Sequence, residues 1–327
     1  MVDANMRLSL REKNMKGLTD IPGLLVGHAS DYDGLTGCTV ILCERGAIAG
    51  GEIRGFATGT GEWDLLSPYH VTEKIHAVVF AGGSAFGLEA ASGVRRFLAH
   101  KGIGVETPSA RVPLVVSAIL YDLSIGKSSA HPTREMGEAA AAAATDKPVV
   151  EGAIGAGTGA TVGKLLGMKG AMKSGIGTFT VTLGSGVMVS ALAAVNAVGD
   201  VIDPATSKII AGARTASGEF ANSAEVMKKG SGQGLVRNTT LVVVATNAAL
   251  SKVDANRLAH VAQVGMARAI NPVNTTSDGD VVIALSIGTE KASIDALGVA
   301  ASEAVAESIL RAVRLAPTLG GVPGLKK

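Results

Sequence analysis

Short apolar runs, rich in β-branched residues, alternate along the chain with turn-rich segments and with stretches of helical periodicity. The run HAVVF (76–80) predicts a buried strand that ends in the glycine turn AGGSAFG. The next stretch, 84–102, places its apolar residues on one side of a helix that ends near Gly102. Residues 131–145 are rich in alanine, which has the best helix propensity, and predict a second helix.

The middle of the chain is glycine-rich and polar. Residues 151–175 carry the densest run of glycine and predict a loop in which the backbone adopts unusual φ values. Residues 176–198 alternate as strands do, whereas 203–234, rich in Gly, Ser and charge, predict a polar connector.

The last third of the chain has the clearest pattern. It predicts, in order, a strand at 239–247, a helix at 251–270, a strand at 281–288 and a helix at 292–315. Ser251 opens the first of these helices, with Asp254 at the capping-box position, and Pro317 closes the second. Strand pairs with helices outside them indicate a layered α/β or α+β sandwich.

Composition narrows the function classes. The 327 residues are 47% hydrophobic but only 3% aromatic, and 43 are glycine, so the core is expected to consist of small aliphatic side chains. A formal charge of +2 with so few aromatic residues provides neither a basic surface nor stacking platforms. Nucleic acid is therefore not an expected partner.

The expected compartment is the cytoplasm. Cys38 and Cys43 lie an odd number of positions apart in a predicted strand, which points them to opposite faces and disfavours a disulfide. The polar N-terminus has no signal-peptide pattern, and the apolar stretch 187–198 is too short to span a bilayer, so no membrane association is expected. No Cys/His cluster indicates a metal site.

Two glycine turns resemble phosphate-binding loops. Gly82 and Gly83 follow a predicted strand and precede a helix, but their spacing is not G-x-G-x-x-G. Gly163-Lys164 resembles the end of a P-loop. However, Thr158 stands where the motif has its first glycine, and Leu165 stands where it has Ser or Thr. A nucleotide-binding protein therefore stays only an alternative, while the Gly83 amide could still hold a carboxylate or an oxyanion of the substrate.

The junction between Asn238 and Thr239 comes directly before a hydrophobic strand. A threonine at a chain terminus carries a hydroxyl and a primary amine on adjacent carbons, and the α-amine has a pKa of about 7.7–8.0. That amine can accept the proton of its own hydroxyl, so one residue supplies both base and nucleophile. The alternative is that Thr239 merely begins a strand, where threonine is favoured.

A second polar group precedes the strand at 281–288. Asp278 and Asp280 are two positions apart, so an extended backbone would place both carboxylates on one side. Such a pair can hold an ammonium or a hydroxyl, can bind a divalent metal, or can simply satisfy a turn. Three further polar residues lie in apolar or glycine-rich settings and need partners if buried: Tyr121, Lys164 and Asn196.

Together these residues resemble one family, the self-cleaving L-aminopeptidases with D-amidase and D-esterase activity, which are related to β-peptidyl aminopeptidases and nylon-oligomer hydrolases. The resemblance rests on GLTDIPG (17–23), GGSAFGLEAASGV (82–94), RVPLVVSAILYDL (111–123), GAGTGATVGK (155–164), VNAVGDV (195–201), NTTLVVVATNA (238–248) and INPVNTTSDGD (270–280). Its Asp-x-Asp sequence is that of the nylon-hydrolase branch, whereas the aminopeptidase branch has Ser-x-Glu.

The resemblance implies a single hydrolase domain, 1–327, with an α+β, four-layer αββα sandwich fold similar to N-terminal nucleophile hydrolases. It implies self-cleavage between Asn238 and Thr239 into chains 1–238 and 239–327, and an acyl-enzyme on Thr239. It also implies a homo-oligomer, often a tetramer, without a cofactor, acting on a small peptide or amide. Supporting roles around the nucleophile fall on Asp278, Asp280, Asn196, Lys164 and Tyr121.

Two further alternatives stay open at this point. Threonine-dependent acyl transfer, as in ornithine acetyltransferases, shares the self-cleavage and a related fold. A processed but non-enzymatic scaffold is a second possibility. The residues do not distinguish L-peptides, D-amides, β-peptides or other amides as the substrate.

Overall fold

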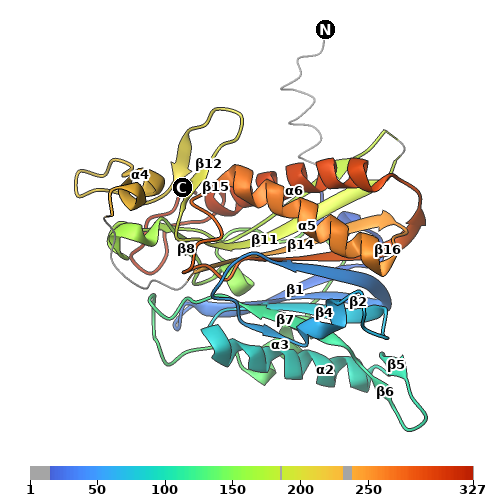
Figure 1. Cartoon of the computed structure of the whole chain (residues 1–327). Coiled ribbons are helices and arrows are strands. Elements are labelled where there is room, and N and C mark those ends of the chain that lie inside the picture. The colour runs from blue at the N-terminus through green and yellow to red at the C-terminus, as the bar shows by residue number, and fades with distance from the viewer. Residues whose placement is uncertain (1–14, 185, 231–237, 327) are drawn as a thin grey trace.

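One bent, nine-stranded sheet forms the centre of the protein; the computed structural model describes residues 15–184, 186–230 and 238–326 (Figure 1). The strand order is β10-β11-β14-β16-β2-β4-β7-β3, and β1 pairs with β2 outside this path. The strands are β1 (Leu25–Asp31), β2 (Thr36–Ile53), β3 (Thr60–Gly61), β4 (Lys74–Ala81), β7 (Val115–Ile119), β10 (Ile176–Thr182), β11 (Met188–Asn196), β14 (Thr239–Ala248) and β16 (Val281–Glu290).

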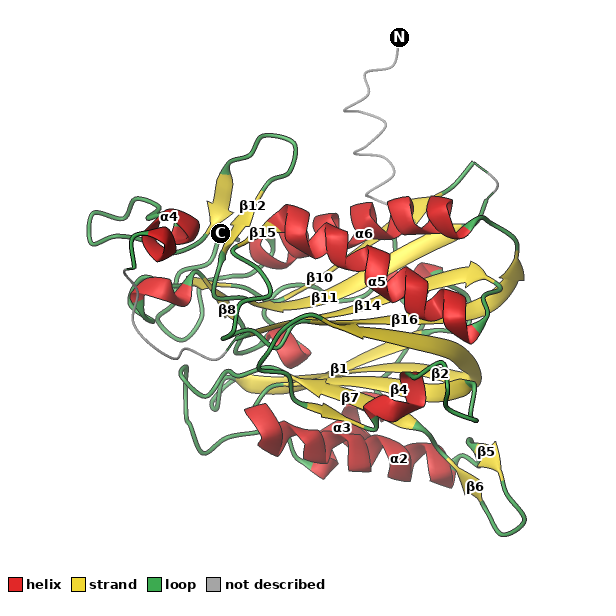
Figure 2. Ribbon diagram, in the orientation of Figure 1, coloured by secondary structure: helices red, strands yellow, loops and turns green. Residues whose placement is uncertain are grey.

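Helices cover the two outer faces of this sheet (Figure 2). They are α2 (Ala90–His100) and α3 (Arg134–Ala142) on one face, and α5 (Lys252–Ala269) and α6 (Ile294–Arg314) on the other. The short helix α4 (Ser223–Lys228) lies beside the sheet, at one end of the molecule. Short strands complete the fold: β5 (Val105–Glu106), β6 (Arg111–Val112), β8 (Thr161–Val162), β9 (Met172–Lys173), β12 (Asp200–Ile202), β13 (Ile209–Ala211) and β15 (Ile270–Asn271). None of the helices in the described ranges has the length and apolarity needed to cross a bilayer.

The long strand β2 turns the sheet into two layers. Its first part, from Cys38 to Leu42, pairs with β4, while its last part, from Ile48 to Ile53, pairs with β16. One strand therefore crosses from the layer that contains β4 and β7 to the layer that contains β14 and β16 (Figure 1).

Three apolar cores separate four layers. Val242 and Val244 of β14 pack under α5 and α6, whereas Leu241 and Val243 point to the core between the two sheet layers. A third core joins β4 and β7 to α2 and α3. Because β14 is buried on both faces, it is a continuous apolar run rather than an alternating one. The predicted αββα sandwich is confirmed.

Most predicted elements agree with the structure. The strand predicted at 239–247 is β14 and the helix predicted at 251–270 is α5, whose cap is the Ser251 hydroxyl accepting from the Asp254 amide at 3.1 Å. Cys38 and Cys43 are both buried and unpaired, and they belong to cores on opposite faces of β2.

The connector predicted at 203–234 is partly wrong, because it contains β13 and α4; its residues 231–237 lie outside the described part of the chain. A buried aspartate outside the segment organises it. Asp200 accepts hydrogen bonds from the Ala213 amide at 2.8 Å and from the Ser223 amide at 2.6 Å. Such a long-range anchor orders a polar sequence that has no apolar periodicity of its own.

Candidate active site

Thr239 is the first residue of β14 and lies between two chain segments. On one side it pairs with Asn196, the last residue of β11. On the other side β14 runs parallel to β16 from Leu241 opposite Val281 onward, and Asn238 pairs with Asp278 in the same register. The chain order therefore brings the ends of β11, β14 and β16 together at Thr239.

Asn238, the residue before Thr239, is hydrogen-bonded through both its amide and its carbonyl. The Asn238 amide donates to the Ser277 carbonyl at 2.9 Å, and the Asn238 carbonyl accepts from the Gly279 amide at 2.8 Å. The Thr239 hydroxyl also donates to this carbonyl oxygen. Asn238 is 1% exposed and Thr239 is 2% exposed, so the bond is enclosed.

The two predicted carboxylates flank this peptide bond through backbone contacts. Asp280 accepts from the Thr240 amide at 2.6 Å and from the Asn274 amide at 3.0 Å. Asp278 accepts from the Val198 amide at 3.3 Å and from both the amide and the hydroxyl of Thr275. Both side chains are buried, and both are positioned by turns and strand ends rather than by each other.

Burial changes the proton affinity of this pair. Loss of solvent raises the pKa of Asp280 to about 7, helped by the neighbouring Asp278 charge. Burial also raises the pKa of Asp278, against the hydrogen bonds that favour its charged form. Two carboxylates this close cannot both ionise easily, so the pair can take up and release a proton near neutral pH.

Lys164 and Asn196 form the opposite side of the site. The Lys164 ammonium donates to the side-chain oxygen of Asn196 at 2.6 Å and to its backbone carbonyl at 3.0 Å. The Asn196 side-chain nitrogen donates to the Tyr121 carbonyl at 2.8 Å. Tyr121 thus enters the arrangement through its backbone. The Thr161 amide also donates to the Asn196 side-chain oxygen, at 3.1 Å, so three partners orient this side chain.

The Lys164 ammonium is fully buried, and burial lowers its pKa to about 7, while the charges of Asp278 and Asp122 oppose this. A lysine with this pKa exchanges its proton near neutral pH, as the Asp280 carboxyl does. Perturbed pKa values of this kind gather where proton transfer takes place.

The glycine turn at Gly82 and Gly83 is occupied from within the protein. The Gly82 amide donates to the Gly37 carbonyl at 2.9 Å, and the Gly83 amide donates to the Asp122 carboxylate at 2.6 Å. A side chain at Gly82 would meet Asp122 at 2.1 Å. The carboxylate expected at this turn is therefore the protein's own, and the turn amides needed for a nucleotide phosphate are already bonded.

Two buried charges near the site had not been predicted. Asp122, which also accepts from the Thr36 hydroxyl at 2.8 Å, has a pKa raised by burial to about 6. The Lys173 ammonium donates to three backbone carbonyls, those of Gly157, Ala160 and Ser174. The sequence signal for Asp122 was its place directly after a buried strand; Lys173 lies in the glycine-dense segment without any motif.

The site therefore contains most of the predicted residues. Asn238 forms a parallel bridge with Asp278, and Asp280 accepts from the amide that follows Thr239. Asn196 lies opposite Thr239 with Lys164 bonded to it. Among the described residues no three His, Cys, Asp or Glu side chains gather as a metal ion requires.

Comparison with known proteins decides the family. The model of peptidase family S58 matches residues 16–327. The chain belongs to peptidase family S58. This S58 peptidase is 37% identical to an uncharacterized aminopeptidase of Mycobacterium leprae over 94% of its own length and 93% of the relative's. It is 30% identical to a 6-aminohexanoate-oligomer endohydrolase of Kocuria sp., over 90% of its length and 85% of the relative's.

A solved structure shows the same fold. The L-aminopeptidase D-Ala-esterase/amidase of Ochrobactrum anthropi, described as a variant of the Ntn hydrolase fold, superposes with a TM-score of 0.71. The match covers 94% of this S58 peptidase and 88% of that chain at 21% identity. The predicted family and fold are both confirmed, and the protein is a hydrolase of peptide or related amide bonds.

Proposed function

We propose that the chain cuts itself between Asn238 and Thr239 and then hydrolyses peptide or related amide bonds through an acyl-enzyme on Thr239. In the first reaction the Thr239 oxygen forms a bond to the Asn238 carbonyl carbon. The bond from that carbon to the Thr239 nitrogen breaks, and the nitrogen takes up the hydroxyl proton. Water then opens the ester, which frees the hydroxyl and leaves a carboxylate on Asn238.

One observation carries this proposal. The Thr239 hydroxyl donates to the carbonyl of the residue before it, in a buried site that also contains Asp278, Asp280 and Lys164. Burial brings the pKa values of Asp280 and Lys164 to about 7 and raises the pKa of Asp278. A nucleophile beside an enclosed carbonyl is already positioned for attack, and such positioning is a large part of catalysis. A threonine that only began a strand would not need this set of buried charges, which is costly to maintain.

In the cut enzyme, the Thr239 α-amine would accept the hydroxyl proton as the substrate carbonyl is attacked, and the leaving amine would take it up. The Asp280 carboxylate accepts from the Thr240 amide, so its negative charge lies beside this amine. We assign to Asp278 a second negative charge that helps to hold the amine. Lys164 would balance that charge. We propose that Asn196, held by Tyr121, orients Lys164 and stabilises the oxyanion of the substrate.

The intact mass of freshly purified protein under denaturing conditions tests the proposal. Wild type should give two chains, ending at Asn238 and beginning at Thr239, while Thr239→Ala should give one folded, inactive chain of 327 residues. A wild-type chain that stays whole during incubation, or a cut Thr239→Ala chain, would contradict the mechanism.

The two products, 1–238 and 239–327, are proposed to remain one domain. β14 and β16 lie between β11 and β2 in the sheet, so the second product is hydrogen-bonded to the first on both sides (Figure 1). Gel filtration without denaturant should therefore give a single peak that contains both chains.

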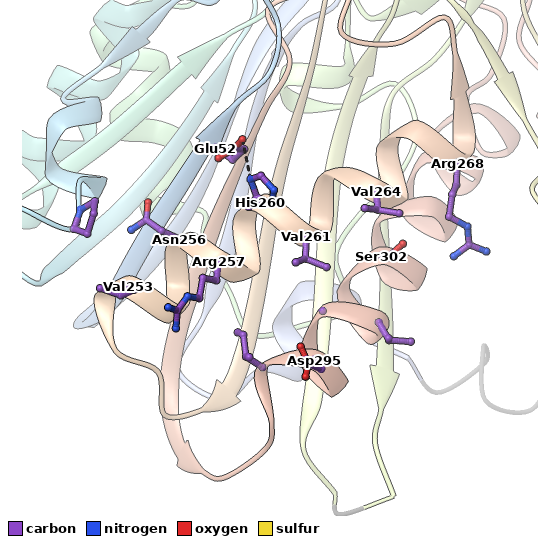
Figure 3. A pocket seen from close by; sticks show the side chains of 14 residues that line it. Glu52, Val253, Asn256, Arg257, His260, Val261, Val264, Arg268, Asp295 and Ser302 are labelled. Atoms are coloured by element: carbon purple, nitrogen blue, oxygen red, sulfur yellow. Dashed lines mark hydrogen bonds and ion pairs between the residues drawn. The ribbon is translucent and has the colours of Figure 1, made fainter.

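We also propose a homo-oligomer, with α5 and α6 at the interface. A groove of about 780 Å³ runs along the outer face of these helices (Figure 3), and Thr239 is not among the residues that line it. Three valines in it, Val253, Val264 and Val299, are 47%, 51% and 70% exposed, and apolar side chains gathered in this way mark contact surfaces. Light scattering should give a mass above that of one chain, and a double substitution of Val264 and Val299 to Asp should lower it.

A reducing compartment, the cytoplasm, is the proposed location. The buried, unpaired thiols of Cys38 and Cys43 support it, because disulfides form where conditions are oxidising. Fractionation of the native cells tests this.

A further inference from the structure

The turn before β8 is fastened to one buried ammonium group. Lys173, in β9, lies opposite Thr161 of β8 and is 0% exposed. Its ammonium donates to the carbonyls of Gly157 at 3.1 Å, of Ala160 at 2.6 Å and of Ser174 at 2.7 Å. An ammonium has three donors, so each of them has a backbone carbonyl as its partner.

The Ala160 carbonyl and the Thr161 amide belong to the same peptide group. The carbonyl of this group accepts from Lys173, and its N–H donates to the Asn196 side-chain oxygen at 3.1 Å. Because a peptide group is planar, a carbonyl that is fixed in place also fixes the direction of its N–H. The positive charge beside the carbonyl polarises the group and strengthens the N–H as a donor.

The same oxygen of Asn196 accepts from the Lys164 ammonium at 2.6 Å. A continuous series of hydrogen bonds thus leads from Lys173, through the peptide group before Thr161 and the Asn196 side chain, to Lys164. The two donors on this oxygen fix which end of the Asn196 amide carries the oxygen and which carries the nitrogen. The nitrogen is the donor that stabilises the oxyanion in the proposed mechanism.

We propose that Lys173 is a positioning residue for the reaction at Thr239. Its ammonium directs the Thr161 N–H at the Asn196 oxygen. Through that bond it keeps the Asn196 amide and the Lys164 ammonium in place, without contact of its own with the substrate. The inference rests on the proposed self-cleavage and acyl-enzyme mechanism, and it adds a residue that no sequence motif indicates.

The setting of Lys173 supports this role over that of an ordinary core residue. Burial lowers the pKa of its ammonium to about 7, and the Asp122 charge opposes this shift. A Cβ atom at Gly159 would lie 2.6 Å from the Asp122 side chain, so this carboxylate lies against the same turn. Burying a charge is costly, and an apolar side chain of the same length would fill the space without that cost. The ammonium is needed where backbone carbonyls must be held.

The rate of self-cleavage of freshly translated Lys173→Met tests the proposal, because methionine keeps much of the apolar length but has no ammonium. The rate should fall by roughly 100-fold, the effect of a small displacement of a catalytic group. Lys252→Met is the matched control. Lys252 is 8% exposed and donates to a backbone carbonyl, that of Thr72, at the start of α5. This control should cleave at nearly the wild-type rate.

A double-mutant cycle with Asn196→Ala separates positioning from a general loss of fold. If Lys173 acts through Asn196, Lys173→Met should slow the Asn196→Ala chain by less than about three-fold, because the group that it positions is already absent. A substitution that only weakened the fold would slow both backgrounds by the same factor. Equal factors in the two backgrounds would overturn the proposal, and so would a wild-type rate of Lys173→Met itself.

An ester in place of the amide before Thr161 provides a measurement that leaves the ammonium in place. It decides the question even if Lys173→Met does not fold. The α-hydroxy analogue of threonine, introduced at position 161 during cell-free translation, removes the N–H that binds Asn196. Self-cleavage should slow by roughly three- to ten-fold, the usual effect of one lost hydrogen bond. An unchanged rate would contradict the assignment.

These outcomes are separate from a failure of the proposed function. A wild-type chain that cleaves itself, with Lys173→Met and the ester chain equally fast, would refute only the positioning role. A wild-type chain that stays whole would refute the mechanism at Thr239, and the positioning role with it.

Discussion

In the described part of the chain the sheet contains two parallel strand pairs, β14 with β16 and β4 with β7. At one end of each pair lies a buried aspartate that accepts from a neighbouring backbone amide. Asp280, just before β16, accepts from the Thr240 amide of β14 at 2.6 Å. Asp122, just after β7, accepts from the Gly83 amide after β4 at 2.6 Å. Burial raises the pKa of both carboxyls. One pair comes from each sheet layer, and the charges of Asp122 and Asp278 both act on Lys164 between them.

The two pairs differ in what lies beside the carboxylate. Next to Asp122 are two glycines and the Thr36 hydroxyl, which donates to the carboxylate itself. Next to Asp280 is the Thr239 hydroxyl, which donates to the carbonyl of the preceding residue. In the first pair the hydroxyl donates to the carboxylate itself, whereas in the second the hydroxyl donates to a peptide carbonyl, the group that a nucleophile would attack.

This difference shows that a buried carboxylate with a raised pKa does not by itself mark an active site. Whether such a carboxylate is structural or catalytic depends on the hydroxyl beside it and on the group that accepts from that hydroxyl. Matched substitutions in the two pairs can test this distinction directly.

Removal of each hydroxyl gives the largest expected contrast. Thr239→Val keeps the β-branched shape that the strand favours but removes the nucleophile, so self-cleavage and turnover should both disappear. Thr36→Val removes only a donor to Asp122 and should leave the rate of self-cleavage within about ten-fold of wild type. Denaturing gels of freshly translated chains measure both. Equal loss in the two variants would mean that the pairs do not differ in role.

Neutralising each carboxylate should give a smaller contrast. Asp280→Asn keeps an oxygen that accepts from the Thr240 amide but loses the charge beside the reacting nitrogen. Self-cleavage should slow by roughly 10²- to 10⁴-fold, the usual contribution of a group that handles protons. Asp122→Asn should slow it by less than about ten-fold. A fast Asp280→Asn chain would remove this carboxylate from the mechanism.

The rate of self-cleavage should depend on pH through both Asp280 and Lys164. The charges of Asp278 and Asp122, one from each strand pair, raise the pKa of Lys164. Self-cleavage should rise with pH through about 7 as Asp280 ionises, and fall above about 7 as Lys164 loses its proton, which gives a bell. Lys164→Met should remove the falling limb. It should also shift the rising limb to higher pH, because the ammonium lowers the pKa of Asp280. Initial rates between pH 5 and about 9 test this, and an unchanged falling limb would exclude Lys164 as its cause.

The smallest predicted effect concerns stability. The pKa of Asp122 is raised from 3.8 to about 6 in the folded state, so the folded protein holds this proton more tightly than the unfolded chain does. The contribution is complete below pH 3.8 and is lost as pH rises through about 6, a change of roughly 3 kcal/mol in the free energy of unfolding. In the uncut Thr239→Val background, Asp122→Asn should flatten this slope in urea unfolding. Parallel slopes in the two proteins would contradict the burial argument.

Local sequence predicted the elements that carry a continuous apolar run or their own cap. The pattern after Thr239 is regular because β14 and β16 are apolar runs and both helices begin at a capping serine, although α5 packs on β2 and β16 and α6 packs on the distant strands β10 and β11. Asp278 and Asp280 were recognisable because their spacing and the strand that follows set both carboxylates at one place. The connector at 203–234 was misjudged because its order depends on Asp200, which is outside it.

The contacts that complete the site join distant segments. Asp122 reaches Gly83 across 39 positions, and Lys164 reaches Asn196 across 32. A single aspartate after a strand carries no information about which turn it will meet. The same holds for Gly279, because the sequence does not indicate that its amide donates to the Asn238 carbonyl.

The place of β14 and β16 between β11 and β2 has a consequence for the lifetime of the enzyme. The uncut chain folds in a first-order reaction, independent of its concentration. Once the bond before Thr239 is broken, any complete unfolding releases two separate molecules, and recovery becomes a second-order encounter that slows with dilution. Such an enzyme would have a single opportunity to fold alone, and its activity would thereafter depend on never losing the central strands of its sheet.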